Sequence, residues 1–147
     1  MIYVGPESYP PYFAIMIGRL LIRLGLGWVP LAPANKGKAS TPDKEARFFE
    51  DPQTYHGWIR IATGFQILDG MNHIHENYKN FKMPVLLVHG KKDRVCEWKG
   101  SEEFYALCGS KDKELIFYDE MQHDIMREDD VAKPLTQTRD WILARAK

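Results

Sequence analysis

The fold is decided by the stretch Pro84-Val85-Leu86-Leu87-Val88-His89-Gly90-Lys91-Lys92-Asp93. Its aliphatic residues would occupy both faces of a strand, as in a buried parallel sheet, and the run ends abruptly in glycine and charge. In open α/β sheets, reactive side chains gather just past the carboxyl ends of such strands. The position of Asp93 therefore makes it a candidate for chemistry.

A second apolar run ends in the same way and is followed by a histidine. Residues 114–119 read Glu-Leu-Ile-Phe-Tyr-Asp, and His123 comes shortly after them. The chain between Asp93 and His123 is long enough for a helix, which we expect over residues 97–107, so the two strands can be parallel neighbours. An aspartate and a histidine at the ends of neighbouring parallel strands are two members of a Ser-His-Asp triad.

Length and composition bound the class of protein. A chain of 147 residues, 44% of them hydrophobic, suits one globular domain. Its 20 basic and 20 acidic residues balance, which argues against a nucleic-acid partner. Two cysteines, Cys96 and Cys108, make no disulfide framework and favour a cytoplasmic protein with reduced thiols. The N-terminus does not have the pattern of a secretory signal, and no apolar run is long enough to span a membrane.

The first half of the chain predicts a short strand at residues 1–5 and a helix over 12–26. This helix is apolar nearly all round, apart from a narrow strip at Arg19 and Arg23, and needs burial against protein or lipid. Residues 31–47 are typical of a loop. Asp51 and Pro52 suit the start of a helix that runs to residue 68 and ends at Asp69-Gly70. Its expected buried stripe is Tyr55, Trp58, Ile59, Ala62 and Phe65.

The second half predicts a loop or short helix at residues 71–82, then the two strands, then a last helix from residue 134 to the end. For the helix between the strands, we expect Phe104, Leu107 and Cys108 to face inward. The expected inner face of the last helix comprises Leu135, Thr138, Trp141, Ile142 and Ala146.

Several short motifs along the chain share the pattern of one enzyme family. They are Met1–Pro6, Glu50-Asp51-Pro52, Gly64–Leu68, Val88-His89-Gly90, Asp93–Cys96, Lys99-Gly100-Ser101, Leu115–Tyr118 and Met121-Gln122-His123. In these motifs the chain resembles the C-terminal part of a monoacylglycerol lipase, in the serine aminopeptidase-like branch of the α/β-hydrolases. The resemblance covers nearly the whole chain but only the back half of that fold.

The resemblance implies a fold and a division of the chain. We expect an α/β architecture, a partial α/β-hydrolase fold with parallel core strands and a helical cap insertion, so that residues 1–147 form the C-terminal part of one domain. Residues 1–6 would be a core strand, 7–75 the cap and its following helix, and 76–147 the core with the Asp and His loops. The helix at 12–26 would then either lie buried under the domain or face a lipid pocket or bilayer. Arg19 and Arg23 would either face solvent or anchor the cap at lipid headgroups, which gives peripheral membrane contact.

The resemblance also implies site residues and a substrate. Asp93 would orient the imidazole of His123, and His123 would act as general base on an apolar ester or lipid. No metal or organic cofactor is implied. Cys96 would lie beside the substrate pocket, or else be an ordinary small buried residue, and nothing in the sequence indicates that it is a nucleophile. The histidines His56, His73 and His75 are interpreted as structural or solvated rather than metal-binding.

One part of the family's machinery is missing from this sequence. The Gly-x-Ser-x-Gly elbow that carries the nucleophile does not occur, and no glycines flank Ser8, Ser40, Ser101 or Ser110 in that pattern. We therefore expect a serine ester hydrolase of which this chain holds the acid and the base. The 147 residues could be a fragment of it, or a partner chain could supply the front half. The alternative is a non-catalytic remnant that binds a lipid or a protein.

Overall fold

The structure, a computed structural model, describes residues 9–33, 46–47 and 49–146. The strand expected at residues 1–5 lies outside the described residues, as does most of the loop expected at 31–47. The described elements, in chain order, are α1 (Tyr12–Arg23), β1 (Pro30–Pro33), β2 (Trp58–Arg60), α3 (Ile61–Glu76), the 3₁₀ helix η2 (Tyr78–Asn80), β3 (Val85–Gly90), α4 (Lys99–Leu107), β4 (Lys113–Tyr118), the 3₁₀ helix η3 (Ile125–Arg127) and α5 (Ala132–Leu143).

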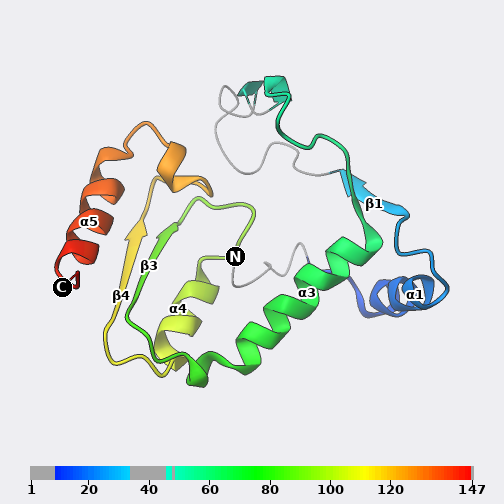
Figure 1. The fold of residues 1–147 in the computed structure, drawn as a ribbon, viewed down its shortest axis with the longest axis horizontal. Coiled ribbons are helices and arrows are strands. Elements are labelled where there is room, and N and C mark those ends of the chain that lie inside the picture. The colour runs from blue at the N-terminus through cyan, green and yellow to red at the C-terminus, as the bar shows by residue number, and fades with distance from the viewer. Residues whose placement is uncertain (1–8, 34–45, 48, 147) are drawn as a thin grey trace.

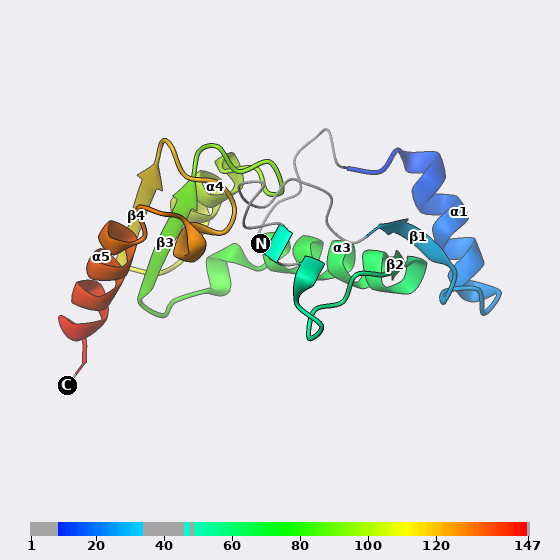
Figure 2. The ribbon, with the colours of Figure 1, turned by 90° about the horizontal axis from the view of Figure 1, so that it is seen from above.

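The centre of the second half is a pair of parallel strands, as the sequence predicts. β3 and β4 are paired from Val85 opposite Lys113 to Gly90 opposite Tyr118, and α4 connects them. Figures 1 and 2 show α4 and α5 on opposite faces of this sheet. Because both strands end at the same edge, the loops that follow them lie side by side.

Alternate residues of the two strands belong to two separate hydrophobic clusters, one on each face of the sheet. Leu87 packs with Phe104 of α4 and with Cys108, which directly follows α4, on one face, while Val88 packs against the cluster that contains Tyr118 on the other face. The prediction for α4 is confirmed for Phe104 and Cys108 but wrong for Leu107, which is exposed. Leu107 precedes Cys108 by one residue, about 100° around the helix, and this turns its side chain out to solvent.

The last helix starts slightly earlier than predicted and uses a different face. α5 begins at Ala132, and its fully buried residue is Pro134. The prediction that Leu135, Ile142 and Ala146 point inward is wrong, since all three are exposed and the helix ends at Leu143. The inner side is instead polar in part, because the Tyr118 hydroxyl donates to the side-chain carbonyl of Gln137 across the sheet face.

The helix expected over residues 51–68 is wrong at both ends. Asp51 caps a turn, where its Oδ1 accepts from the amide of Gln53 at 2.8 Å, and the chain then enters β2. β1 pairs antiparallel with β2. The helix starts only at Ile61, because the amides of Ile61 and Ala62 donate to carbonyls of the segment before β1. Tyr55 and Trp58, which were expected in the buried stripe, are therefore exposed, although Phe65 is buried as predicted.

The same helix also passes through the predicted stop. Asp69 and Gly70 lie inside α3, which continues to Glu76. Asp69 forms an ion pair with Arg19 of α1, so its side chain has a partner outside the helix. This tertiary contact, and the open space around Gly70, let the helix continue through a pair of residues that usually ends one.

Helix α1 is shorter than predicted and is mostly exposed. It ends at Arg23, and Gly25 then takes a left-handed conformation with φ of 78°. It packs on α3 so closely that a Cβ at Gly18 would lie 2.2 Å from the ring of Phe65. Its exposed apolar residues are Tyr12, Phe13, Met16, Ile17 and Leu20, and Leu24, which directly follows the helix, is exposed as well. In the described residues, α1 is thus not buried under the domain, and no helix there is long and apolar enough to cross a membrane.

A single glycine brings the loops after β3 and β4 together. A Cβ at Gly90 would lie 2.3 Å from the carbonyl oxygen of Met121 and 2.4 Å from that of Gln122. Backbone atoms cannot move out of the way as a side chain can, so any larger residue at this position would push the two loops apart.

We expect Gly90→Ala to lower the free energy of unfolding by about 2 kcal/mol or more, because the new methyl group meets fixed carbonyls. Urea denaturation followed by circular dichroism measures it. Gly70→Ala is the matched control: its site is open, and alanine in the helix should stabilise by about 0.5–1 kcal/mol. If Gly90→Ala were as stable as wild type, the close approach of the two loops would be wrong.

Candidate active site

The two residues predicted from the strand ends meet in space. The amide of Asp93 donates to the carbonyl of Gly90 at 3.1 Å, which makes the turn that follows β3. The amide of Lys92 donates to Met121 of the second loop at 3.0 Å. Within this frame, Nδ1 of His123 lies 2.8 Å from Oδ2 of Asp93. The spacing in sequence therefore becomes a direct hydrogen bond.

The carboxylate of Asp93 is buried and fully engaged. Its side chain is 3% exposed, and Oδ2 also lies 3.1 Å from Nε2 of His89. Oδ1 accepts from the amides of Val95 and Cys96 at 2.7 and 2.9 Å. Burial by itself would raise the pKa of Asp93, but these hydrogen bonds, led by the one from His89, outweigh it and hold the pKa well below its ordinary value. Asp93 is therefore ionised at neutral pH.

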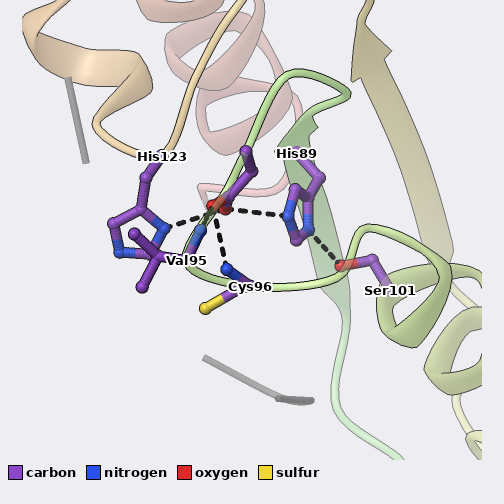
Figure 3. Close-up of polar contacts among 6 residues, drawn as sticks. His89, Val95, Cys96, Ser101 and His123 are labelled. Atoms are coloured by element: carbon purple, nitrogen blue, oxygen red, sulfur yellow. Dashed lines mark hydrogen bonds and ion pairs between the residues drawn. The ribbon is translucent and has the colours of Figure 1, made fainter. Parts of the chain in front are cut away.

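The imidazole of His123 has one side on the carboxylate and the other side open. In Figure 3, a dashed line joins one ring nitrogen of His123 to the carboxylate of Asp93, and the other ring nitrogen points away from the carboxylate. The ring borders a cavity of about 320 Å³ that is also lined by Val88 and by residues 124–127. Because ionised Asp93 can only accept, His123 must donate through Nδ1, which leaves Nε2 unprotonated in the neutral ring. This is the arrangement that a general base requires.

The structure adds two residues that the sequence analysis did not assign to the site. His89 stands at the end of β3, and its Nδ1 lies 2.7 Å from the hydroxyl oxygen of Ser101 in the first turn of α4 (Figure 3). A signal was available. His89 is two residues after Leu87, so both side chains lie on the strand face that contacts α4. Ser101 is three residues before Phe104, so both lie on the helix face that contacts the sheet. Together, these two spacings place His89 and Ser101 opposite each other.

Cys96 lies beside the acid–base pair, in the loop after Asp93. It is 3% exposed, and its Sγ, an oxygen of Asp93 and a ring nitrogen of His123 lie within 4.8 Å of one another. Burial, and then the charge of Asp93, raise the pKa of the thiol to about 11. The thiol is therefore protonated at neutral pH and unsuited to act as a nucleophile. Its predicted place beside a substrate pocket stays a prediction.

These three side chains are also the group, among residues 9–33, 46–47 and 49–146, whose atoms could surround a metal ion. Each carboxylate oxygen of Asp93 already accepts two hydrogen bonds, so the oxygens that would bind the ion are already used within the protein. His75 instead faces Glu103 at 3.2 Å, and His56 contacts Thr54. The described histidines outside the site thus have surface surroundings, as the sequence analysis expected.

Two of the four serines lie within the described residues, and both are buried. Ser101 contacts His89, and Ser110 donates to the carbonyl of Asp112 at 2.9 Å. Ser8 and Ser40 lie outside the described residues. The described part of the chain therefore holds an aspartate and a histidine in triad geometry, with no exposed serine on the open side of His123.

Comparison with known proteins gives these residues a context. Residues 1–130 match the protein family described as Serine aminopeptidase, S33. The chain is 30% identical to a caffeoylshikimate esterase of Arabidopsis thaliana, over 99% of this chain and 46% of that protein. It is 26% identical to a monoglyceride lipase of Homo sapiens, over 87% of this chain and 42% of that protein. The chain spans less than half the length of these relatives.

Solved structures show the same fold. A monoacylglycerol lipase of Paleococcus ferrophilus superposes with a TM-score of 0.81 at 23% identity, over 99% of this chain and 56% of that chain. A soluble variant of monoglyceride lipase from Saccharomyces cerevisiae, in complex with a substrate analogue, also gives 0.81, at 21% identity over 100% of this chain and 51% of that chain. At these identities the likeness concerns the fold alone.

We expect Asp93→Asn to lower the free energy of unfolding by about 2 kcal/mol at pH 7, because a buried acceptor of charge-assisted hydrogen bonds is lost. The folded-state pKa of Asp93 is depressed, so its ionised form stabilises the fold above the pKa of an unfolded aspartate, about 3.9, and this contribution declines as the pH falls further. The difference between wild type and variant should therefore shrink below about pH 4.

Urea denaturation at a series of pH values measures this difference. The control is Asp119→Asn, which removes an exposed carboxylate paired with Lys91 at 2.8 Å and should change the stability little. A loss in Asp93→Asn that stays equal at pH 3 and pH 7 would contradict a role for the charge.

Proposed function

Because this chain belongs to the serine aminopeptidase S33 family, in the monoacylglycerol lipase-like branch of the α/β-hydrolases, we propose that Asp93 and His123 are the acid and base of a serine ester hydrolase. The observation that carries the proposal is the 2.8 Å hydrogen bond from Nδ1 of His123 to buried Asp93, together with the cavity that His123 borders. A carboxylate on one nitrogen and open space at the other is the geometry of a general base in acyl transfer.

In this mechanism Nε2 of His123 takes the proton from a serine hydroxyl as the serine attacks the ester carbonyl. Asp93 stabilises the imidazolium that forms and keeps Nδ1 protonated. His123 then gives the proton to the leaving alcohol, and a water molecule activated by the same nitrogen releases the acyl group. The nucleophile would come from a Gly-x-Ser-x-Gly segment outside these 147 residues, in the same polypeptide or in a partner.

This proposal gives the chain a place in the whole domain. Residues 1–147 would be the C-terminal part of one α/β-hydrolase domain, with residues 1–6 as a core strand and 7–75 as the cap with its following helix. Residues 76–147 would form the core that carries the two loops. The fold supports this division, since α1 and β1 lie away from the β3–β4 sheet and α3 runs between them (Figure 1).

An apolar cavity supports a lipid-like substrate. It has a volume of about 430 Å³ and lies mainly between α1 and α3. Among the residues that the structure describes, its walls carry no charged or polar side chain; they are formed by Pro10, Phe13, Ala14, Ile17, Gly18, Leu21, Leu31, Ile61, Gly64, Phe65, Ile67 and Leu68. An alkyl chain gains free energy from such walls, whereas a peptide would leave its polar groups unpaired. We therefore favour an ester with one long apolar group, such as a monoacylglycerol.

The outer side of α1 would bring the protein to its substrate. Its apolar residues are exposed, while Arg23 closes the last turn. Arg19 lies over the ring of Phe65 and pairs with Asp69, so it is tied to α3 rather than free to reach a headgroup. Peripheral contact with a membrane would thus rest on the apolar residues of α1.

The competing function is a non-catalytic module that binds a lipid in the same cavity. The cavity needs no residue of the Asp and His loops, so it could hold an alkyl chain even where no nucleophile is present. Reading the native transcript upstream of the codon for Met1 separates the two. An in-frame Gly-x-Ser-x-Gly segment supports the hydrolase, and its absence together with the absence of a complementing subunit supports the binding module.

In the polypeptide or complex that carries the nucleophile, we expect His123→Ala to lower kcat for a monoacylglycerol by about 10³-fold, because general base catalysis is lost. The control is His73→Ala, which removes an exposed histidine of α3 and should keep the wild-type rate. Release of free fatty acid measures both. Equal rates for the two variants would contradict the assignment of His123.

We expect Ile17→Asp to weaken binding of a monoalkyl glycerol ether by about tenfold or more, because a carboxylate then lines the apolar cavity. Leu20→Asp is the matched control on the same helix: the two side chains are 54% and 56% exposed, but Leu20 does not line the cavity. Calorimetric titration with the monomeric ether measures both. If the two variants weaken binding equally, the alkyl chain binds the outer face of α1 and not the cavity.

A further inference from the structure

We propose that His89 and Ser101 are positioning residues, a hydrogen-bonded relay that holds Asp93 in the orientation that fixes the tautomer of His123. The inference rests on the proposed function of Asp93 and His123 and extends it to two residues that touch neither the substrate nor the nucleophile. The relay runs from the Ser101 hydroxyl to Nδ1 of His89 at 2.7 Å, and from Nε2 of His89 to Asp93 at 3.1 Å.

The direction of each hydrogen bond follows from the groups that take part. Asp93 is ionised and can only accept, so His89 must donate to it through Nε2. A neutral imidazole that donates through Nε2 has an unprotonated Nδ1, which can only accept. The hydroxyl of Ser101 then has to donate to Nδ1. For a neutral His89, one assignment of protons therefore satisfies all three side chains, and Asp93 fixes it because an ionised carboxylate can only accept.

The relay restrains the carboxylate from the side opposite the base. Oδ2 of Asp93 accepts from both histidines, while Oδ1 accepts from two backbone amides. With both oxygens held, the carboxylate cannot turn to present a different lone pair to His123. The hydrogen bond from His89 also stabilises the ionised form of Asp93. This opposes transfer of the proton from His123 to the carboxylate.

The same three residues could be mistaken for a second Ser-His-Asp triad, but their surroundings argue against one. Ser101 is 6% exposed, and the side chain of His89 is 14% exposed. Neither residue lines the apolar cavity or the one beside His123. A substrate carbonyl has no room at the hydroxyl of Ser101, so the serine serves as a buried donor and not as a nucleophile.

Long-range ¹H–¹⁵N NMR of the imidazole rings in the 147-residue chain tests the relay directly. From the hydrogen-bond geometry we expect His89 to carry a proton on Nε2 and none on Nδ1, and His123 to carry a proton on Nδ1. A proton on Nδ1 of His89, or a doubly protonated ring, would overturn the proposal, because Ser101 would then be an acceptor or unbonded.

Substitutions test the effect of the relay on the base. In His89→Leu the carboxylate loses one donor, and we expect His123 to show a mixture of tautomers. In His89→Gln the side-chain amide can still donate to Asp93, so the single tautomer of His123 should be retained. In Ser101→Ala, Nδ1 of His89 loses its donor, so its ¹⁵N resonance should move toward that of an unbonded acceptor nitrogen while the proton stays on Nε2, whereas Ser110→Ala, which removes an equally buried but remote serine, should leave both rings unchanged. Equal behaviour of the leucine and glutamine variants would overturn the relay.

In the hydrolase that carries the nucleophile, His89→Leu should lower kcat about tenfold with KM unchanged, the rate equivalent of one charge-assisted hydrogen bond. The two proposals fail separately. If the tautomers are as predicted but no ester is hydrolysed, the proposed function fails and the relay stands as the anchor of Asp93. If hydrolysis depends on His123 but not on His89, the relay fails alone.

Discussion

The buried carboxylate of Asp93 is the interaction on which the rest of the site depends. A charge with 3% exposure is costly unless it is well paired, and here four donors from three parts of the chain converge on it. The donors belong to the end of β3, to the loop that follows β3 and to the loop after β4. The hydrogen bonds to this one carboxylate thus fix the relative positions of three segments. The orientation of His123 follows from these positions.

This convergence needs the two loops to approach more closely than ordinary side chains permit. The parallel register places Gly90 opposite Tyr118, so that each strand ends beside the other. Without a Cβ at Gly90, the carbonyls of Met121 and Gln122 can lie against the backbone of the first loop. The electrostatic network and the steric allowance are therefore complementary, because neither would place His123 on Asp93 without the other.

The parts of the fold that could be predicted are those with local causes. The composition of a short apolar run predicts a buried parallel strand. Asp93 and His123 were predicted as site residues because they follow the ends of two such strands. The wrong predictions for the two ends of α3 have distant causes. α3 begins at Ile61 because its first amides meet carbonyls near β1, and it passes Asp69 because Arg19 comes from another helix. His89 was missed because its role depends on Ser101, a partner that only strand parity and helix spacing together would reveal.

The division between the two halves of the chain has an evolutionary consequence. The walls of the apolar cavity come from α1, β1, α3 and Pro10, while the acid, the base and their anchors come from β3, α4 and the loops at the sheet edge. In the described part of the chain, no side chain belongs to both sets. Selection could therefore reshape the cavity for a shorter, longer or bulkier alkyl group without disturbing proton transfer. A fold arranged in this way can diversify its ligands while it conserves its chemistry.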